Sequence, residues 1–245
     1  MGGSGAELFL CSVAGWCCVV KKVDLAALTF DDFQNEIRIL EQLPMHPNTL
    51  RYLGHDQTRT ELRLFIELWD GTLGDEIKKR RRFVSPSSNS SSSAPVARPN
   101  YFSTNEITQI AIWIASGVLH LHSNHIIHRD LKTDNIFIRL NEKKSIISAA
   151  VGDFDTAKDS LISDLSTVIG SPSFIAPEVL EAKELGRYNS ACDVYSYGLI
   201  LYEILTLTPP YEGVPMLKVA QKILDGEIPQ ISAEITKKHK FFVDF

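Results

Sequence analysis

Cysteine is scarce in this sequence, and its arrangement argues against two common classes of protein. Only four of the 245 residues are cysteine, at positions 11, 17, 18 and 192. Secreted domains stabilised by disulfides have a much higher cysteine density, and structural zinc sites need ligand pairs at short fixed spacings that are absent here. We therefore expect reduced thiols in a cytoplasmic protein.

An excess of basic charge is also lacking. Lys and Arg number 25 against 30 Asp and Glu, so the formal net charge at pH 7 is −5. Proteins that bind nucleic acid through general electrostatic attraction carry a surplus of cations to neutralise the phosphates. We therefore expect no nucleic-acid partner.

The long apolar runs of a membrane anchor are missing as well. Segments 8–20 and 107–128 are both free of charged residues. The first is shorter than the roughly 20 residues needed to cross a bilayer, and no basic stretch precedes it. The second is long enough, but it contains four histidines and several amide and hydroxyl groups that lipid would leave poorly hydrogen-bonded. We expect no membrane segment in this chain.

Apolar residues nevertheless make up 44% of the chain, which is enough for a substantial core. Short apolar runs predict strands at 7–13, 16–23, 50–54 and 61–68, and the turn signal at 14–15 predicts a hairpin between the first two. A helix is expected between the second and third runs, because apolar residues recur there at helical spacing up to Pro44. Glu36 is a carboxylate on this otherwise apolar face.

A serine-rich tract interrupts the pattern, with seven serines in the nine residues 85–93. Such a tract cannot bury enough apolar surface to offset its ordering entropy, so we predict a flexible insertion over 84–100. The five consecutive cations at 78–82 are most simply the solvated end of a helix, with an acidic partner or a regulatory phosphate as the alternative.

The second half of the chain has mainly helical periodicity. Apolar residues from Ile107 to Leu121 follow one helical stripe, and the segment 193–205 is apolar around its whole circumference, as in a central buried helix. Strands followed by helices are typical of an α+β fold, and we expect two lobes.

Two polar segments lie beside apolar runs in this half. They are His-Arg-Asp-Leu-Lys-Thr-Asp-Asn at 128–135 and Val-Gly-Asp-Phe-Asp at 151–155. Neither contains a zinc-binding histidine motif or the nucleophile turn of a hydrolase. Oxygen side chains such as those of Asn135 and Asp153 suit a hard cation, and Mg²⁺ held with substrate phosphates needs only one or two protein carboxylates.

In these segments the chain resembles the protein kinase family, whose catalytic loop and magnesium loop they match. Residues 176–178, Ala-Pro-Glu, are similar to the end of the family's activation segment. The resemblance covers nearly the whole chain and implies a bilobal kinase fold that uses ATP and Mg²⁺. It implies that Asp130 takes the proton of the substrate hydroxyl and that Lys132 neutralises the transferred phosphoryl group. Asn135 and Asp153 would hold Mg²⁺.

Strand alternation gives an independent indication at Lys21. A strand through 19–23 places Lys21 and Lys22 on opposite faces, so one lysine must point inward. A buried lysine and a buried Glu36 are each costly alone, and pairing offsets much of that cost. The family resemblance pairs Lys21 with Glu36 and directs Lys21 to the ATP phosphates. The alternative is that both are solvated surface charges.

Other resemblances concern the nucleotide and the lobes. Gly3 and Gly5 resemble the glycine loop that covers the phosphates, although the spacing differs and a frayed terminus is the alternative. Residues 67–69, which include Glu67 and Trp69, look like the hinge that binds adenine. The resemblance implies one kinase domain over 1–245, with the small lobe and hinge at 1–69 and the large lobe at 70–245.

The substrate class also follows from resemblance. Lys132 and the segment 170–174 look like the pattern of serine/threonine kinases, which implies protein substrates with Ser or Thr acceptors. Segments 128–137 and 15–16 are most similar to the tyrosine-kinase-like group, which includes the Raf and mixed-lineage kinases.

The activation segment contains several candidate phosphoacceptors. A phosphate there could pair with Arg129 and order the segment, which would make an upstream kinase a partner. The residues concerned are Ser160, Ser163, Ser166 and Thr167, and Ser171 lies in the same segment.

Three departures from the family pattern leave alternatives open. Asp155 stands where the family has a glycine, the chain looks truncated at both ends, and the arginine that would pair with Glu178 is missing. An active serine/threonine kinase is one interpretation, and a catalytically weak or inactive scaffold that binds partners is another. A small-molecule kinase is a third, which the complete activation segment disfavours.

Overall fold

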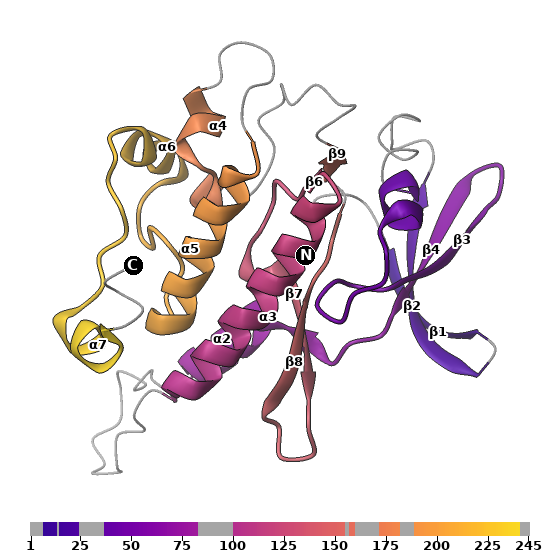
Figure 1. Ribbon diagram of the computed structural model, residues 1–245, viewed down its shortest axis with the longest axis horizontal. Coiled ribbons are helices and arrows are strands. Elements are labelled where there is room, and N and C mark those ends of the chain that lie inside the picture. Colours follow the sequence, from indigo (N-terminus) through magenta and orange to yellow (C-terminus); the bar gives the residue numbers. More distant parts are fainter. Residues whose placement is uncertain are drawn as a thin grey trace.

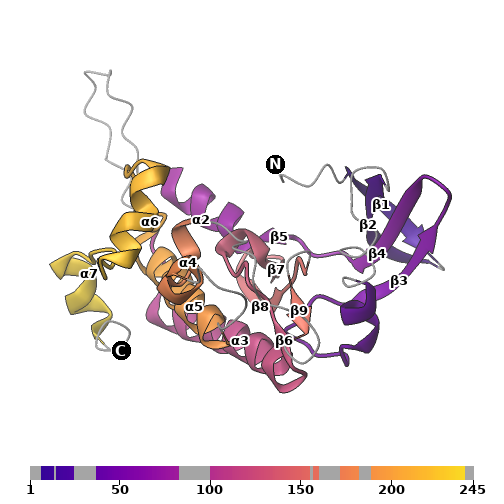
Figure 2. The ribbon, with the colours of Figure 1, turned by 90° about the horizontal axis from the view of Figure 1, so that it is seen from above.

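The computed structural model describes residues 7–13, 15–24, 37–82, 100–154, 157–159, 172–181 and 189–240. Several predicted features lie outside these ranges: Gly3, Gly5, Glu36, Asp155, Ser160, Ser163, Ser166, Thr167, Ser171 and all of the serine-rich tract except Asn100. A four-stranded sheet forms one end of the molecule, and helices form most of the other (Figures 1 and 2). This arrangement confirms the expected α+β fold in two lobes.

The four-stranded sheet is antiparallel, in the order β1-β2-β4-β3. Its strands are β1 (Glu7–Val13), β2 (Trp16–Asp24), β3 (Tyr52–Gln57) and β4 (Glu61–Glu67). All four were predicted, but β3 begins later than expected. Leu50 donates its backbone N–H to the carbonyl of Val151, 2.8 Å away, and so belongs to the contact with the helical part instead.

One expectation about the cysteines is wrong. Cys11 and Cys18 form a disulfide across β1 and β2, with their Cα atoms 5.3 Å apart, whereas Cys17 and Cys192 are free thiols. The turn at Gly15, where φ is 85°, sets a register in which Cys11 lies directly opposite Cys18. Directly opposed residues of antiparallel strands are close enough to be bridged. Spacing along the chain did not indicate this pairing.

Two long helices organise the other part of the molecule. In α3 (Thr104–Ser123) the predicted apolar stripe is buried from Ile107 to Leu121. This helix begins with a capping box, in which the side chains of Ser103 and Glu106 each bind the other's backbone N–H. Helix α5 (Ala191–Thr206) includes the segment that was predicted to be a central helix, and it buries Asp193, Ile200 and Glu203.

The remaining elements are short. They are β5 (Gly71–Thr72), α2 (Leu73–Arg82), β6 (Ile126–Ile127), the 3-10 turn η1 (Thr133–Asn135), β7 (Ile136–Leu140), β8 (Ile146–Val151), β9 (Lys158–Asp159), the 3-10 turn η2 (Pro172–Phe174), α4 (Pro177–Glu181), α6 (Met216–Leu224) and α7 (Ala233–Lys238). Strands β6 and β7 flank the polar segment 128–135, so this loop is held at both ends.

The loop before β3 joins the sheet end to the helical end. The Asn48 side chain donates to the carbonyl of Ala149 at 2.8 Å, and the Asn48 carbonyl accepts the N–H of Val151 at 2.9 Å. Gly117 of α3 lies against the same loop. The sheet is therefore attached through this loop to β8 by direct hydrogen bonds and to α3 by close packing, as well as by the connection between β4 and β5.

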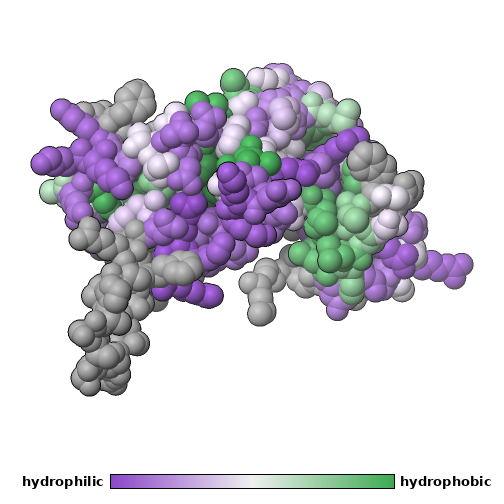
Figure 3. Space-filling model, turned by 90° about the horizontal axis from the view of Figure 1, so that it is seen from below, coloured by the Kyte–Doolittle hydropathy of each residue, from purple (hydrophilic) through white to green (hydrophobic). Residues whose placement is uncertain are grey.

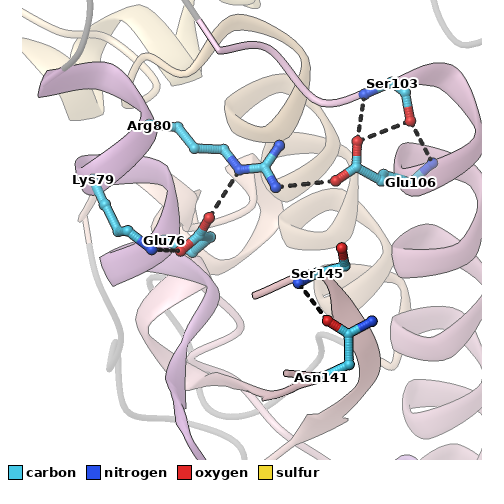
Figure 4. Close-up of polar contacts among 7 residues, drawn as sticks. All are labelled: Glu76, Lys79, Arg80, Ser103, Glu106, Asn141 and Ser145. Carbon is cyan, nitrogen blue, oxygen red and sulfur yellow. Dashed lines mark hydrogen bonds and ion pairs between the residues drawn. The ribbon is translucent and has the colours of Figure 1, made fainter. Parts of the chain in front are cut away.

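The basic run at the end of α2 is largely paired with carboxylates. Arg80 is buried and bridges Glu76 of α2 and Glu106 of α3, at 2.9 and 3.0 Å (Figure 4). Its guanidinium also lies 3.9 Å from the ring centroid of Phe102. Lys78, Lys79 and Arg81 contact Asp134, Glu76 and Glu212. The interpretation as a solvated helix end holds for Lys78, Lys79, Arg81 and Arg82, which are exposed at the end of α2, and it is wrong for Arg80, which is buried.

The surface of the sheet end is markedly apolar. Edge strand β1 exposes Leu8, Phe9 and Leu10, and Figure 3 shows hydrophobic side chains gathered over this end of the molecule. Among the described residues, no helix is both long enough and apolar enough to cross a membrane.

We predict that Gly117→Ala destabilises the protein by about 1–3 kcal/mol, as overpacking does. A Cβ at this position would lie 2.2 Å from the Asn48 carbonyl oxygen. Gly198→Ala in α5 is the matched control, since its Cβ would meet nothing within 4 Å. Helical propensity alone favours alanine by about 0.5–1 kcal/mol at both sites. Urea unfolding of the two variants measures the difference, and equal stability would contradict the close packing of the loop on α3.

Candidate active site

A cavity of about 370 Å³ opens between the four-stranded sheet and the helical part of the molecule. Elements from both sides contribute to it. The lining residues are Leu8, Val19, Lys21, Leu40, Leu50, Tyr52, Ile66, Glu67, Trp69, Gly71, Thr72, Asp134, Asn135, Phe137, Asp153 and Phe154. A concave, mostly apolar site with a few convergent polar groups is typical of small-molecule binding.

The apolar lining comes from opposite walls. Leu8 and Val19 extend from β1 and β2, and Phe137 extends from β7. Ile66, the residue before the predicted hinge, is also in the lining. Apolar surfaces on two sides can enclose a flat ring such as a nucleobase.

The predicted hinge residues lie between two cavities. Glu67 and Trp69 line the first cavity and also a second one of about 460 Å³. The Glu67 carboxylate is bound by the Arg139 guanidinium at 2.5 Å, and that guanidinium stacks 4.5 Å from the centroid of the Trp69 ring. The Glu67 backbone N–H donates to the carbonyl of Arg51 at 3.0 Å. These contacts hold the connection between β4 and β5 in place.

Strand alternation predicted the orientation of the two lysines of β2. Lys21 is buried and lines the cavity, whereas Lys22 extends from the other face to the Glu61 carboxylate at 2.5 Å. The Lys21 ammonium lies 3.8 Å from the nearer carboxylate oxygen of Asp153. The predicted partner Glu36 lies outside the described residues. A cation is therefore held inside the cavity opposite one of the predicted metal ligands.

The polar loop at 128–135 is anchored by Asp193 of α5. This carboxylate is fully buried and accepts the backbone N–H groups of His128 and Arg129, both at 2.9 Å. The ring of His122 of α3 lies 2.8 Å from the same carboxylate. Hydrogen bonds to an ionised acceptor are about twice as strong as neutral ones, so Asp193 fixes the backbone of the loop.

His128 connects this loop to the segment that contains Asp153. Its Nε2 lies 2.9 Å from the carbonyl of Gly152, so Nε2 carries a proton, and its Nδ1 accepts the N–H of Asp130 at 3.3 Å. The N–H of Gly152 in turn donates to the carbonyl of Asn135 at 3.0 Å. Gly152, the residue before Asp153, is thus bonded to the polar loop through both its N–H and its carbonyl.

Asp130 contacts two other predicted catalytic-loop residues, Lys132 and Asn135. Lys132 donates to an Asp130 carboxylate oxygen at 2.5 Å, and the Asn135 amide nitrogen donates to the Asp130 carbonyl at 2.8 Å. Asn135 lines the cavity, whereas Asp130 and Lys132 lie next to it rather than among its lining residues. Asp130 is therefore placed at the edge of the site through its contact with Asn135.

The donor set of Asn135 and Asp153 fits a magnesium ion. The amide nitrogen of Asn135 is used inside its own loop, which leaves the amide oxygen as the group available for a cation. Asp153 contributes a carboxylate in the same cavity lining. Hard cations prefer such oxygen ligands, and Mg²⁺ that is shared with phosphates needs few of them from protein. No group of three or more His, Cys, Asp or Glu suited to a metal occurs in the described part of the chain.

A buried carboxyl that the sequence did not single out supports the same loop. Glu203 of α5 accepts the hydroxyl of Thr133 at 2.8 Å. Burial raises the pKa of the Glu203 carboxyl above its ordinary value, although the bond from Thr133 acts in the opposite direction. Glu203 and Thr133 are 70 positions apart, so no local pattern indicated the contact.

The raised pKa of Glu203 predicts a pH-dependent effect of Glu203→Gln. Ionisation is disfavoured in the folded state, so the stability cost of the charge is absent below the unfolded-state pKa and complete above the folded-state pKa. Glutamine can still accept from Thr133 without the charge. We expect the variant to gain in unfolding free energy over the wild type as the pH rises from about 4 to about 8.

Urea unfolding of both proteins across this range measures the difference. Glu181→Gln, on an exposed residue of α4, is the control and should show no such trend. A stability difference for Glu203→Gln that stays constant with pH would contradict the assigned burial effect.

Of the features predicted for the activation segment and its phosphate partner, the structure describes Arg129, the turn η2 and Glu178. Arg129 is buried and has a φ of 71°, in the left-handed region. The carbonyl of Phe174 accepts the hydroxyl of Ser196 at 2.7 Å, which ties η2 to α5, and Glu178 lies in the first turn of α4. The candidate phosphoacceptors lie outside the described residues.

The structure therefore brings together most of the predicted site residues that it describes. Lys21, Glu67, Trp69, Asn135 and Asp153 line one cavity, and Asp130 and Lys132 join it through Asn135. The sequence analysis missed several contributors to the cavity and its support, namely Leu40, Leu50, Tyr52, Thr72, Asp134 and Glu203.

Comparisons with known proteins agree with this arrangement. The sequence pattern of the protein kinase domain matches residues 3–243 of the chain. The chain is 34% identical over 242 residues to "Kinase and exchange factor for Rac B" of Dictyostelium discoideum, which covers 96% of the chain and 20% of that protein. It is 28% identical over 226 residues to human "Serine/threonine-protein kinase Nek5", which covers 90% of the chain and 28% of that protein.

A third relative comes from plants. The chain is 30% identical over 221 residues to "MAP3K epsilon protein kinase 1" of Arabidopsis thaliana, covering 86% of the chain and 14% of that protein. The chain thus spans between about a seventh and little more than a quarter of the length of these three proteins.

Proposed function

The chain belongs to the protein kinase family, and we propose that it transfers the γ-phosphoryl group of ATP to serine and threonine hydroxyls of proteins. The observation that carries the proposal is the shared cavity of Lys21, Asn135 and Asp153, with Asp130 bonded to Asn135 at its edge. Serine/threonine kinases among its relatives support the substrate class.

The walls of the cavity suggest how the nucleotide is bound. Leu8 and Val19 would cover one face of adenine and Phe137 the other, while the backbone of 67–69 would meet its edge. The buried ammonium of Lys21 would bind phosphate oxygens, and this charge is worth more in a partly desolvated cavity than in water. A glycine loop that includes Gly3 and Gly5 would cover the phosphates from above.

Asn135 and Asp153 would hold Mg²⁺ through their side-chain oxygens. When bound, the ion neutralises phosphate charge and orients the terminal phosphoryl group. The hydrogen bonds between Gly152, His128 and Asn135 would keep these two ligands at a fixed separation. Lys21, beside Asp153, would be further held by Glu36.

Asp130 would act on the acceptor. Its carboxylate would orient the substrate hydroxyl and accept its proton, and Lys132, already bonded to Asp130, would neutralise charge on the transferred group. Catalysis would then rest on positioning and electrostatics. The alternative of an inactive scaffold that only binds partners is disfavoured, because these charged side chains converge instead of being dispersed.

Three further assignments belong to the proposal. The motif at 128–137 supports membership of the tyrosine-kinase-like group. We divide the domain into a small lobe with hinge at 1–69 and a large lobe at 70–245, with an insertion at 84–100. We assign it to the cytoplasm, where its co-substrate ATP is available.

The direct test is phosphate transfer from radiolabelled ATP to mixed Ser, Thr and Tyr peptides. We expect transfer to Ser and Thr, and a loss of about 10²–10⁴-fold in rate for Asp130→Asn, because the variant has no general base. Asp225→Asn, on an exposed residue after α6, is the control and should keep the wild-type rate. Equal rates for wild type and Asp130→Asn, or transfer by neither protein, would overturn the proposal.

We also propose that phosphorylation activates the chain. A phosphate on Ser160, Ser163, Ser166 or Thr167, added by an upstream kinase, would pair with the buried guanidinium of Arg129 and order the activation segment. Phosphatase treatment should lower the turnover of the wild type, and replacement of all four acceptors by alanine should abolish this sensitivity. Turnover that is unaffected by both treatments would contradict it.

A further inference from the structure

The turn η1, which ends at the proposed metal ligand Asn135, is held by a different partner at each of its three residues. Thr133 donates to Glu203 of α5, and Asn135 donates to the carbonyl of Asp130 within the loop. Asp134, between them, is bound from the side by α2. Asp134 and Asn135 both line the nucleotide cavity, so the contact from α2 is made to a residue of the cavity wall.

Two residues of α2 contact Asp134. The Lys78 ammonium lies 2.7 Å from a carboxylate oxygen of Asp134. Gly74 is one helical turn earlier and therefore on the same face of α2. A Cβ on Gly74 would lie 2.6 Å from the same oxygen and 3.2 Å from the backbone nitrogen of Asp134. The helix backbone can approach the turn this closely only because residue 74 has no side chain.

The other cations of the basic run have different partners. Lys79 and Arg80 bind Glu76, Arg80 also binds Glu106, and Arg81 binds Glu212. Lys78 is thus the member of the run that reaches the catalytic loop. The hydrogen bond that Lys78 donates to Asp134 is the largest influence on the pKa of Lys78 and raises it, so the ammonium stays charged at neutral pH.

We propose that Gly74 and Lys78 are positioning residues that hold Asn135 in its metal-binding geometry. They do so by fixing the neighbouring Asp134, Gly74 through close packing and Lys78 through an ion pair. This inference rests on the proposed function, in which Asn135 binds Mg²⁺. Supporting groups next to metal ligands orient them, and their loss commonly lowers metal affinity 10–100-fold. Lys78 also neutralises a carboxylate that would otherwise repel the phosphates of a nucleotide in the same cavity.

The principal test compares Gly74→Ala with Gly198→Ala. Both replace a helical glycine, but the new Cβ is crowded only at position 74. We measure the Mg²⁺ concentration needed for half-maximal binding of a fluorescent ADP analogue, together with the thermal midpoint of the nucleotide-free protein. We expect Gly74→Ala to need about tenfold more Mg²⁺. Gly198→Ala should match the wild type, and both variants should remain folded.

A second set of variants separates positioning from general damage. Asp134→Ala removes the carboxylate oxygen that the new methyl would strike at 2.6 Å, so adding Gly74→Ala to Asp134→Ala should cost much less Mg²⁺ affinity than Gly74→Ala costs in the wild type. Lys78→Met should raise the Mg²⁺ requirement, and Lys78→Arg should restore most of the affinity, since arginine can also bind the Asp134 carboxylate. Neither lysine variant depends on whether Gly74→Ala folds.

The outcomes are distinguishable. A wild-type Mg²⁺ requirement in both Gly74→Ala and Lys78→Met would overturn the inference and leave the proposed function intact. Additive losses in the Gly74→Ala, Asp134→Ala double variant would also overturn it. If the wild-type protein itself showed no Mg²⁺-dependent nucleotide binding, the proposed function would fail instead.

Discussion

The buried carboxylate of Asp193 is the constraint on which the rest of the site depends. An ionised group without contact to water must have its charge satisfied internally. Two consecutive backbone N–H groups of the polar loop and the ring of His122 provide this, each within 2.9 Å of the carboxylate. Since α5 is packed into the core, the loop that is bonded to it is held rigidly as well. A rigid loop is what a reaction based on positioning requires.

Further hydrogen bonds connect this anchored loop to the segment that contains Asp153, through the His128 ring and the backbone of Gly152. His128 bonds to Gly152, which adjoins the proposed ligand Asp153, and Gly152 bonds to Asn135, which is the other proposed ligand. The apolar contact between the rings of His128 and Phe154, whose centroids are 5.6 Å apart, packs the same junction. The two polar segments recognised in the sequence are therefore one structural unit, although 15 residues of strand and turn separate Asn135 from Val151.

Features that depend on local periodicity could be predicted from the sequence. The buried stripe of α3 and the opposite orientations of Lys21 and Lys22 follow from helical and strand spacing. Features that depend on contacts between different elements could not be predicted from it. The Cys11–Cys18 bridge depends on the turn between two strands, and the pairing of Arg80 with Glu106 depends on the packing of α2 against α3. The contact of Glu203 with Thr133 depends on the approach of α5 to the catalytic loop.

The attachment of Asn48 and Leu50 to β8 limits how the nucleotide cleft can open. The sheet is joined to the helical part at two places, the loop that contains Asn48 and Leu50 and the chain connection after Glu67. The hydrogen bond from the Glu67 N–H to the Arg51 carbonyl keeps these two places next to each other. A sheet that is held at two neighbouring points can still rotate, relative to the helical part, about the line that joins these points. Opening of the cleft would thus be a rotation of the sheet about this line. Strand β1 would move furthest, and it carries apolar residues that would face the base.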